Sequence, residues 1–269
     1  MATIVEDFES GNLDAYGGTD NARLQQDIVF AGTWALTNDA LDNPSNTITS
    51  VAGLNAYPAA GDTFEFRFRH EADMTAPNFH FGCQKELNQN AREDLYDIGI
   101  GGSISGIELR VYIGTERTTL IPSESLPWVA EVWYRIQVDW GTNGDIALLV
   151  DDESGTEVWS GATNDTTYTS GGIGFRLPAN SVETAFFDNV VILDDTISRT
   201  IRDDATGDAV SGVRVIAISD NGDGIIAGTQ TSDTNGLVTF SDLSSGTYAL
   251  VAIDSSGNKI DAEYSVVIA

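Results

Sequence analysis

The chain has 269 residues, and its 41 acidic and 13 basic side chains give a formal net charge of −28. This length predicts one large or two ordinary domains with a substantial core. Because 41% of the residues are hydrophobic, the acidic excess belongs to a folded surface and not to a disordered tail. Such a surface makes nucleic acid a poor partner, since it repels the phosphate backbone.

The basic side chains are of nearly one kind: eleven are arginine, and only Lys85 and Lys259 are lysine. The net charge would repel itself at ordinary ionic strength and would be screened in concentrated salt. Abundant acid together with scarce lysine therefore predicts a protein of an extreme halophile, or of a virus that infects one. The alternative is a merely acidic, soluble protein.

Cys83 is the single cysteine, which excludes an internal disulfide and says little about the compartment. Two absences do bear on the compartment. Residues 1–20 contain neither the basic nor the apolar region of a secretory signal. No apolar run approaches the ~20 residues of a membrane span. We therefore expect a polypeptide that is made in the cytoplasm and does not insert into a membrane.

Short segments in which apolar and polar residues alternate follow one another along residues 1–195, which indicates β-strands. In residues 63–70, Phe64, Phe66 and Phe68 would face a core while the residues between them face away. Asn143-Gly144 separates two such segments and indicates a hairpin. The pattern predicts an all-β fold, a two-sheet antiparallel jelly-roll sandwich over residues 1–195. The other predicted strands cover residues 78–84, 95–100, 107–113, 132–138 and 146–150.

Residues 171–193 organise this domain and are predicted to form two strands with a loop between them. The second strand, residues 184–193, has the apolar and aromatic density of a buried strand and contains one acid, Asp188. A buried carboxylate needs a partner. We expect that partner in the opening segment, residues 5–11, so that the two segments lie side by side and close the sandwich.

The order of short motifs also permits a family comparison. The domain opens with Asp7-Phe8-Glu9 and closes with Asp188-Asn189-Val190, and Trp133-Tyr134-Arg135 and Gly172-Ile173-Gly174 lie between them. Over residues 4–194 this order resembles concanavalin A-like and laminin-G-like jelly rolls. It is similar also to carbohydrate-binding modules that open with Asp-Phe-Glu and end on an Asp-Asp-Val strand.

The resemblance implies a structural calcium ion held by Glu9 and Asp188, with Asp7 as a third candidate ligand. Carbonyl oxygens near Gly32 and Thr33 would complete the shell of six to eight oxygens that calcium prefers. Asn189 stands where the family pattern has a second acid, which removes one charge. The alternative is that Asp188 is hydrogen-bonded across the strands and holds no ion.

The composition changes after residue 195. The segments 206–213, 232–240 and 243–248 carry a pattern of Thr-Gly, Val-Ser-Gly-Val and Gly-Thr-Tyr elements. This pattern resembles prealbumin-like and carboxypeptidase-regulatory-like domains. The resemblance predicts an Ig-like β-sandwich over residues 196–269.

Motifs for catalysis are missing from the sequence. Glycosidases on related jelly rolls carry paired acids as Glu-x-Asp-x-x-Glu on one strand, and no predicted strand here has that pair. No Gly-x-Ser-x-Gly elbow and no phosphate-binding loop occur. We therefore predict a protein that is not an enzyme.

A sugar-binding site would need polar donors beside an aromatic surface. We expect one sheet to present such a polar face, and Trp128, Trp133 and Trp159 are candidates for the stacking surface, although tryptophans in a sandwich are more often core. The candidate ligand-binding residues are Arg67, Arg69, His80, Gln84, Arg110 and Tyr112.

The two domain types usually act outside the cell, yet residues 1–20 carry no export signal. The chain thereby resembles virion surface proteins of tailed viruses of halophilic archaea. We predict a virion structural protein, located in the particle as a capsid decoration, turret or tail fibre. It would form a trimer, pentamer or hexamer with itself and contact other virion proteins, and host-surface glycan could be a further partner. The alternative is a glycan-binding or adhesion module on a haloarchaeal cell surface, outside the cell.

Overall fold

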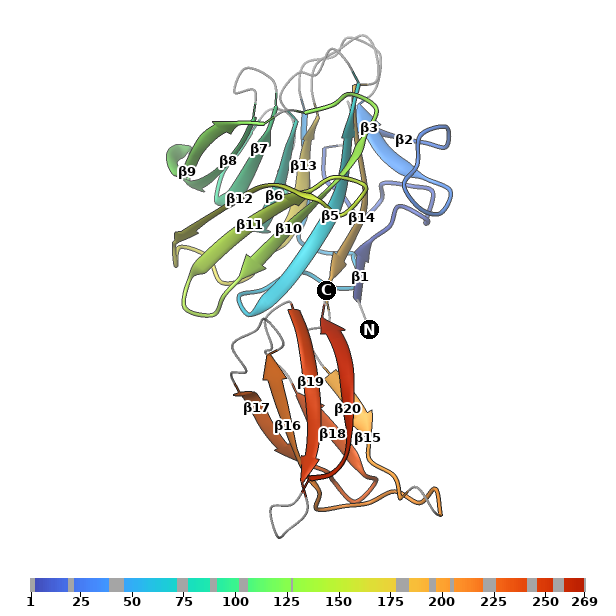
Figure 1. Ribbon diagram of the computed structural model, residues 1–269. Helices are drawn as coiled ribbons and strands as arrows, with labels where there is room; N and C mark the ends of the chain where they lie inside the picture. Colours follow the sequence, from blue (N-terminus) through green and yellow to red (C-terminus); the bar gives the residue numbers. More distant parts are fainter. Residues whose placement is uncertain are drawn as a thin grey trace. The chain divides into compact units, whose positions relative to one another are not determined.

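The computed structural model describes the chain except residues 1–2, 19–21, 39–45, 72–76, 88–90, 102–105, 127, 178–183, 194–196, 204–205, 220–225, 241–245, 254–258 and 269. The chain divides into two compact units, Ala2–Ile192 and Leu193–Ala269. Figure 1 shows β-strands in both units. Nowhere in the described ranges is there a helix of the length and hydrophobicity needed to cross a membrane.

Two antiparallel sheets build the first unit (Figure 1). Sheet A has the strand order β12-β11-β10-β5-β14-β3-β2, with β1 paired to β14, and sheet B has the order β4-β13-β6-β7-β8-β9. The strands of sheet A are β1 (Thr3–Glu6), β2 (Ala22–Gln25), β3 (Ala35–Asn38), β5 (Asp62–His70), β10 (Trp133–Trp140), β11 (Asp145–Asp151), β12 (Glu157–Asn164) and β14 (Ala185–Ile192). Those of sheet B are β4 (Asn46–Ser50), β6 (Asn78–Cys83), β7 (Leu95–Ile100), β8 (Gly106–Ile113), β9 (Glu116–Ser125) and β13 (Gly172–Leu177).

The core lies between the inner faces of the two sheets. Phe64, Phe66 and Phe68 on β5 are fully buried, as their alternation predicts. The ring of Phe66 stacks on that of Phe79 from sheet B with 4.0 Å between centroids, and such contacts add to the burial of large apolar surfaces. The predicted all-β fold with a two-sheet antiparallel sandwich is confirmed.

Strand β14 closes sheet A, as predicted for residues 184–193. It pairs with β1 through Thr3 opposite Ile192 and Ile4 opposite Val191, and Figure 1 shows the two strands side by side. On its other side β14 pairs with β5, with a register shift after Asp188. Asn189 has a φ of 56° at this shift, a left-handed conformation that non-glycine residues rarely adopt.

Five strands of the first unit, β2, β3, β4, β9 and β12, were not among the predicted ones. Only Ile121 of the ten β9 residues is buried, and β9 and β12 each form one edge of a sheet. Edge strands with polar residues on both faces do not show the alternation on which the prediction depends.

The second unit contains two further sheets. β15 (Ile197–Thr200) pairs with β18 (Leu237–Phe240), and a four-stranded sheet has the order β17-β16-β19-β20. The strands of the larger sheet are β16 (Arg214–Ser219), β17 (Ile226–Thr231), β19 (Gly246–Ile253) and β20 (Lys259–Ile268). The core of this second unit contains Val213, Val215, Ala217, Val238, Phe240, Tyr248 and Leu250. The unit is therefore all-β, and its likeness to prealbumin-like domains stays an expectation.

Candidate functional site

The predicted ligand-binding residues do not share one sheet. Arg67 and Arg69 lie on β5 in sheet A, whereas His80 on β6 and Arg110 and Tyr112 on β8 lie in sheet B. Since the two sheets pack inner face to inner face, the outward side chains of these strands face opposite sides of the sandwich. The expectation of a single shared face is therefore wrong. The structure instead offers two separate polar faces.

Gln84 follows β6 and bridges two backbone segments. Its Nε2 donates hydrogen bonds to the carbonyl oxygens of Gly82, at 2.9 Å, and Ser170, at 2.7 Å. The side-chain amide thereby ties the end of β6 to the residues before β13. This contact gives Gln84 a structural role in the fold.

The outer face of sheet A carries charges that are matched. Asp188, Arg67, Arg135 and Asp151 are successive cross-strand partners. Glu65 pairs with Arg67 at 2.8 Å and with Arg135 at 3.5 Å. Arg135 Nε also donates to Asp151 at 2.9 Å. The alternation of β5 thus places Glu65 and Arg67 on the outer face of sheet A. There they join a salt-bridge network in which each arginine lies beside an acid.

An aromatic contact covers part of this face. The Phe30 ring lies 5.8 Å from the Trp133 ring, and the Arg67 guanidinium lies 4.6 Å from the centre of the Phe30 ring. Phe30 is 41% exposed, but Trp133 and Trp159 are buried, and Trp128 packs against the core. None of the three predicted stacking tryptophans exposes its ring to a ligand. The exposed aromatic residue on this face is Phe30, which the sequence analysis did not name.

The outer face of sheet B carries a second group of polar side chains, which we call the sheet B cluster. Its centre is a row of three cross-strand partners, His80 on β6, Asp97 on β7 and Arg110 on β8. Asp97 accepts a hydrogen bond from Arg110 at 2.9 Å and one from Arg92 at 3.4 Å. The remaining members are Asn78, Glu108, Tyr112 and Arg176, and Glu108 forms an ion pair with Arg110.

Burial governs the ionisation of this cluster. His80 is fully buried, which lowers its pKa despite the neighbouring Asp97, so the imidazole is neutral at pH 7. Burial raises the pKa of Asp97, but the adjacent His80 ring and the charges of Arg110 and Arg92 outweigh it and lower that pKa to about 2. Since His80 is neutral at pH 7, we assign the stabilisation of the Asp97 carboxylate to the arginines.

Several polar atoms of the sheet B cluster have no hydrogen-bond partner among the described residues: both ring nitrogens of His80, Asp97 Oδ1, Arg110 Nε and Asn78 Oδ1. His80 Nε2 and Asp97 Oδ1 are 3.2 Å apart, yet their geometry does not meet the criteria of a hydrogen bond. Buried polar atoms without partners are costly and uncommon in folded proteins. Their concentration on one sheet face marks it as a candidate binding surface.

Glu9 and Asp188 lie against the same loop, as the family resemblance implies. Glu9 Oε1 accepts hydrogen bonds from the amide groups of Thr33, at 2.6 Å, and Trp34, at 2.9 Å. Asp188 Oδ2 accepts from those of Phe30, at 2.9 Å, and Ala31, at 3.2 Å. The two carboxylates thus accept hydrogen bonds from amide N–H groups of this loop. The carbonyl oxygens near Gly32 and Thr33, which were expected as calcium ligands, are not among these contacts.

Two observations fit a cation at these carboxylates. Asp188 Oδ1 is buried and has no partner in the described part of the chain. Burial is the main cause that raises the Asp188 pKa to about 6, its amide hydrogen bonds lower it, and the nearby Glu9 charge adds to the increase. Asp7 does not join this pair, because its Oδ1 accepts the amide of Glu9 at 3.1 Å. Among the described residues, no three His, Cys, Asp or Glu side chains are placed to hold a metal ion.

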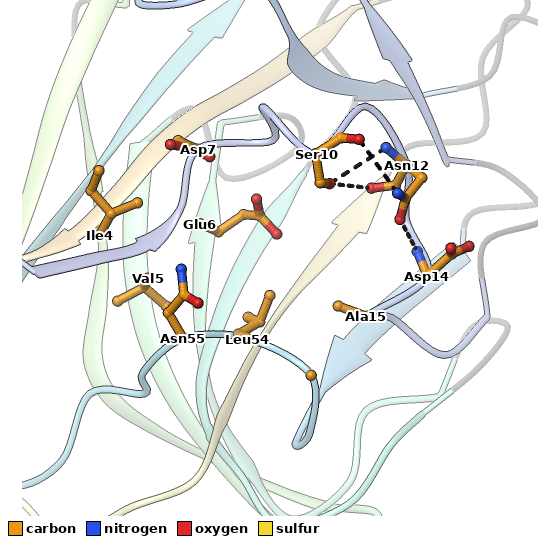
Figure 2. Close-up of a pocket in the computed structure, with 11 residues that line it drawn as sticks. Ile4, Val5, Glu6, Asp7, Ser10, Asn12, Asp14, Ala15, Leu54 and Asn55 are labelled. Atoms are coloured by element: carbon orange, nitrogen blue, oxygen red, sulfur yellow. Dashed lines mark hydrogen bonds between the residues drawn. The ribbon is translucent and has the colours of Figure 1, made fainter.

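A cleft of about 520 Å³ lies beside β1 and the loop that follows it. Figure 2 shows the side chains around it, among them Glu6, Asp7 and Asp14. Glu6 is buried, which raises its pKa, and its carboxylate accepts hydrogen bonds from the Phe8 amide at 2.6 Å and the Tyr16 hydroxyl at 3.0 Å. The cleft was not predicted, because apart from Asp7 of the opening Asp-Phe-Glu motif its lining comes from loops and strand ends that carry no recognisable motif.

The sequence has no match among protein-family models or curated proteins. The chain is similar in structure to carbohydrate-binding module CBM66 from Bacillus subtilis, with a TM-score of 0.47, 12% identity and coverage of 66% of this chain and 95% of that one. It is similar also to the exoplasmic/lumenal domain of VIP36 with Ca²⁺ and mannose bound (TM-score 0.49, 9% identity, 70% and 88% coverage). A third likeness is to the endo-β-1,4-glucuronan lyase of the fungus Trichoderma reesei (TM-score 0.43, 16% identity, 71% and 95% coverage).

Proposed function

We propose that the first unit is a non-enzymatic carbohydrate-binding module and that the outer face of sheet B contacts the sugar. The observation that carries the proposal is the sheet B cluster, a group of buried polar side chains in which His80, Asp97 and Arg110 have atoms with no hydrogen-bond partner in the described part of the chain. Sugar hydroxyl groups both donate and accept, so they match a surface of guanidinium, carboxylate, amide and imidazole groups. Arg92, which is 26% exposed, gives a ligand access to the cluster.

The absence of an enzymatic role is part of the same proposal. General acid catalysis requires a group whose pKa lies near the working pH. The pKa of Asp97 is about 2, so at neutral pH this side chain holds no proton to donate. The cluster therefore supports binding better than proton transfer.

Glycan-array binding of three proteins would test the site. We expect the wild type to bind a defined set of glycans and the double variant Arg92→Gln/Arg176→Gln to lose at least roughly tenfold in affinity, which corresponds to one charge-assisted contact. The matched variant Arg67→Gln/Arg69→Gln on sheet A should keep the affinity. If the sheet A variant loses binding instead, the site lies on the face where Phe30 is exposed beside Arg67, which is the second candidate surface.

We also propose a structural calcium ion between Glu9 and Asp188. A cation that binds only the folded state raises the melting temperature, so melting in multimolar salt should occur at a higher temperature with calcium than with chelator. Glu9→Gln should abolish the difference, whereas Asp7→Asn should preserve it because Asp7 contacts the Glu9 amide. An identical melting temperature with and without calcium in the wild type would contradict the ion.

The place of the protein in a virus particle is a proposal that rests on the sequence. The same samples would test it by light scattering, because a virion component is expected as a trimer, pentamer or hexamer. A monomer in multimolar salt, together with absence from purified particles, would favour the module on a cell surface.

A further inference from the structure

We infer that the first unit holds a second ligand site, an open cleft beside Trp34 that takes the ring of a neutral sugar. The cleft is lined by the loop after β1, by β2 and by the residue that precedes β3, and it shares no residue with the sheet B cluster. The inference therefore goes beyond the proposed function, and either site can fail its test while the other stands.

The lining of this cleft is mainly apolar. Its volume is about 580 Å³, which is the size of a small-molecule site. Asn12 and Asp14 are polar members of the lining, and both also line the neighbouring cleft of about 520 Å³ beside β1. An apolar pocket with a few polar groups is the usual form of a ligand site. The apolar side of the cleft is formed by Leu13, Tyr16, Leu24 and Trp34.

Trp34 is placed as an aromatic platform. Its backbone amide donates a hydrogen bond to Glu9 Oε1 at 2.9 Å. Its indole lies beside Gly11, where an added β-carbon would be 3.5 Å from Trp34 Nε1. The residue is thus held by the loop after β1, yet it is only half-buried and lines the cleft. A fixed aromatic ring offers a large contact area with little loss of side-chain entropy, and the C–H groups on one face of a pyranose ring can pack on it.

Asp14 supplies the directional contact. Asn12 Oδ1 accepts the Asp14 amide at 3.0 Å, and Ser10 Oγ donates to the Asn12 carbonyl oxygen at 3.1 Å, so the loop is braced by its own side chains (Figure 2). The Asp14 side chain itself is exposed. Its two oxygens can therefore accept charge-assisted hydrogen bonds from two neighbouring hydroxyl groups of one sugar ring.

The charge of the lining favours a neutral sugar over an acidic one. Asp14 is an acid, and no base occurs among the described residues of the cleft. The neighbouring cleft adds Glu6 and Asp7, again without a base in the described lining. In a chain with a net charge of −28, this region would repel a ligand carboxylate.

NMR of the indole N–H groups would test the site. The chain has five tryptophans, and the variant Trp34→Phe identifies the Trp34 signal by its disappearance. The probes are cellohexaose and mannohexaose, with the hexamer of galacturonate as the acidic comparison and choline as a cationic one. We expect a neutral hexaose to shift the Trp34 signal in a saturable manner and the galacturonate hexamer to leave it in place. The signals of the buried Trp140 and Trp159 should not move.

Asp14→Asn should weaken binding of the neutral hexaose at least roughly fivefold, because charge-assisted hydrogen bonds become neutral ones. The matched control is Glu116→Gln, which removes an exposed acid from β9 and should bind as the wild type does. Trp34→Ala should abolish binding. Since Trp34 also packs against the core, the exposed Asp14 carries the test if Trp34→Ala does not fold.

The double variant Arg92→Gln/Arg176→Gln should leave the response of the Trp34 signal unchanged, and loss of that response would overturn the inference of a separate site. A Trp34 signal that neither neutral hexaose moves would overturn it too, as would full affinity in Asp14→Asn. A shift produced by choline and not by the sugars would assign the cleft to an organic cation and overturn the sugar. None of these results would bear on whether the sheet B variant loses glycan-array binding, so the two sites are tested separately.

Discussion

Replacement of Asp97 by asparagine is expected to lower the free energy of unfolding by about 3 kcal/mol, because the loss of one partner leaves buried charge uncompensated. Asp97 is fully buried, and its carboxylate binds Arg110 at 2.9 Å and Arg92 at 3.4 Å. Without the negative charge, the arginines of the sheet B cluster would repel one another more strongly. Denaturant unfolding at fixed salt concentration would measure the loss.

The control is Glu116→Gln, which removes an exposed acid from the edge strand β9 and should change stability by less than about 0.5 kcal/mol. A double variant Asp97→Leu/Arg110→Met should be less destabilised than Asp97→Asn, since it removes one positive charge together with the negative charge, and the Arg92 and Glu108 that then lose a partner carry opposite charges. Equal stability of Asp97→Asn and the wild type would show that the carboxylate does not hold the arginines together.

The effect of Asp97 should depend on pH in a defined window. Its pKa in the folded protein is about 2, below the ordinary value of 3.8. A carboxylate with a lowered pKa stabilises the fold fully above its ordinary pKa, and that contribution disappears as the pH falls through the folded-state value. The difference in unfolding free energy between the wild type and Asp97→Asn should therefore shrink between about pH 4 and pH 2.

Replacement of Gly172 by alanine is expected to cost about 3 kcal/mol of stability through overpacking. A β-carbon at this position would lie 1.7 Å from the Ser50 carbonyl oxygen and 2.6 Å from its carbon. Both are backbone atoms of β4, and β13 lies between β4 and β6, so neither strand can retreat without breaking a ladder of hydrogen bonds. Denaturant midpoints of the variant and the wild type would measure the cost.

The matched control for Gly172→Ala is Gly155→Ala. Gly155 has a φ of 76° and no atom within 4 Å of the added carbon, so alanine there meets only backbone strain of about 1 kcal/mol. Gly172 does not have a left-handed φ, so its loss comes from the contact with Ser50 and should exceed the loss from backbone strain alone at Gly155. Similar losses in both would mean that β4 moves aside at little cost.

The fold could be predicted from the sequence where a strand has one buried face. The alternation in β5 and the apolar density of β14 identify these strands, because side chains of a strand alternate between core and solvent. Sheet membership could not be predicted in the same way. β5 pairs with β10 and β14 and not with β6, its successor in the sequence, so Arg67 and His80 have the same local pattern and opposite locations.

The candidate site could be predicted only in part for the same reason. His80, Arg110 and Tyr112 were named as candidates, and Asn78, Asp97, Glu108 and Arg176 were not. Each of the four missed residues lies in a segment that the sequence had already indicated as a strand. What brings them together is the pairing of β6 with β7 and β13, and of β7 with β8, and such register is determined by the whole sheet.

The pairing of Thr3 with Ile192 has a consequence for synthesis of the chain. On the ribosome, β1 emerges first and its partner β14 emerges only when the first unit is nearly complete. Contacts of such high sequence separation make folding slow, since the closure of long loops precedes any gain from pairing. Through most of translation the nascent chain therefore exposes unpaired strand edges, which stay open to contacts with neighbouring chains until sheet A can close.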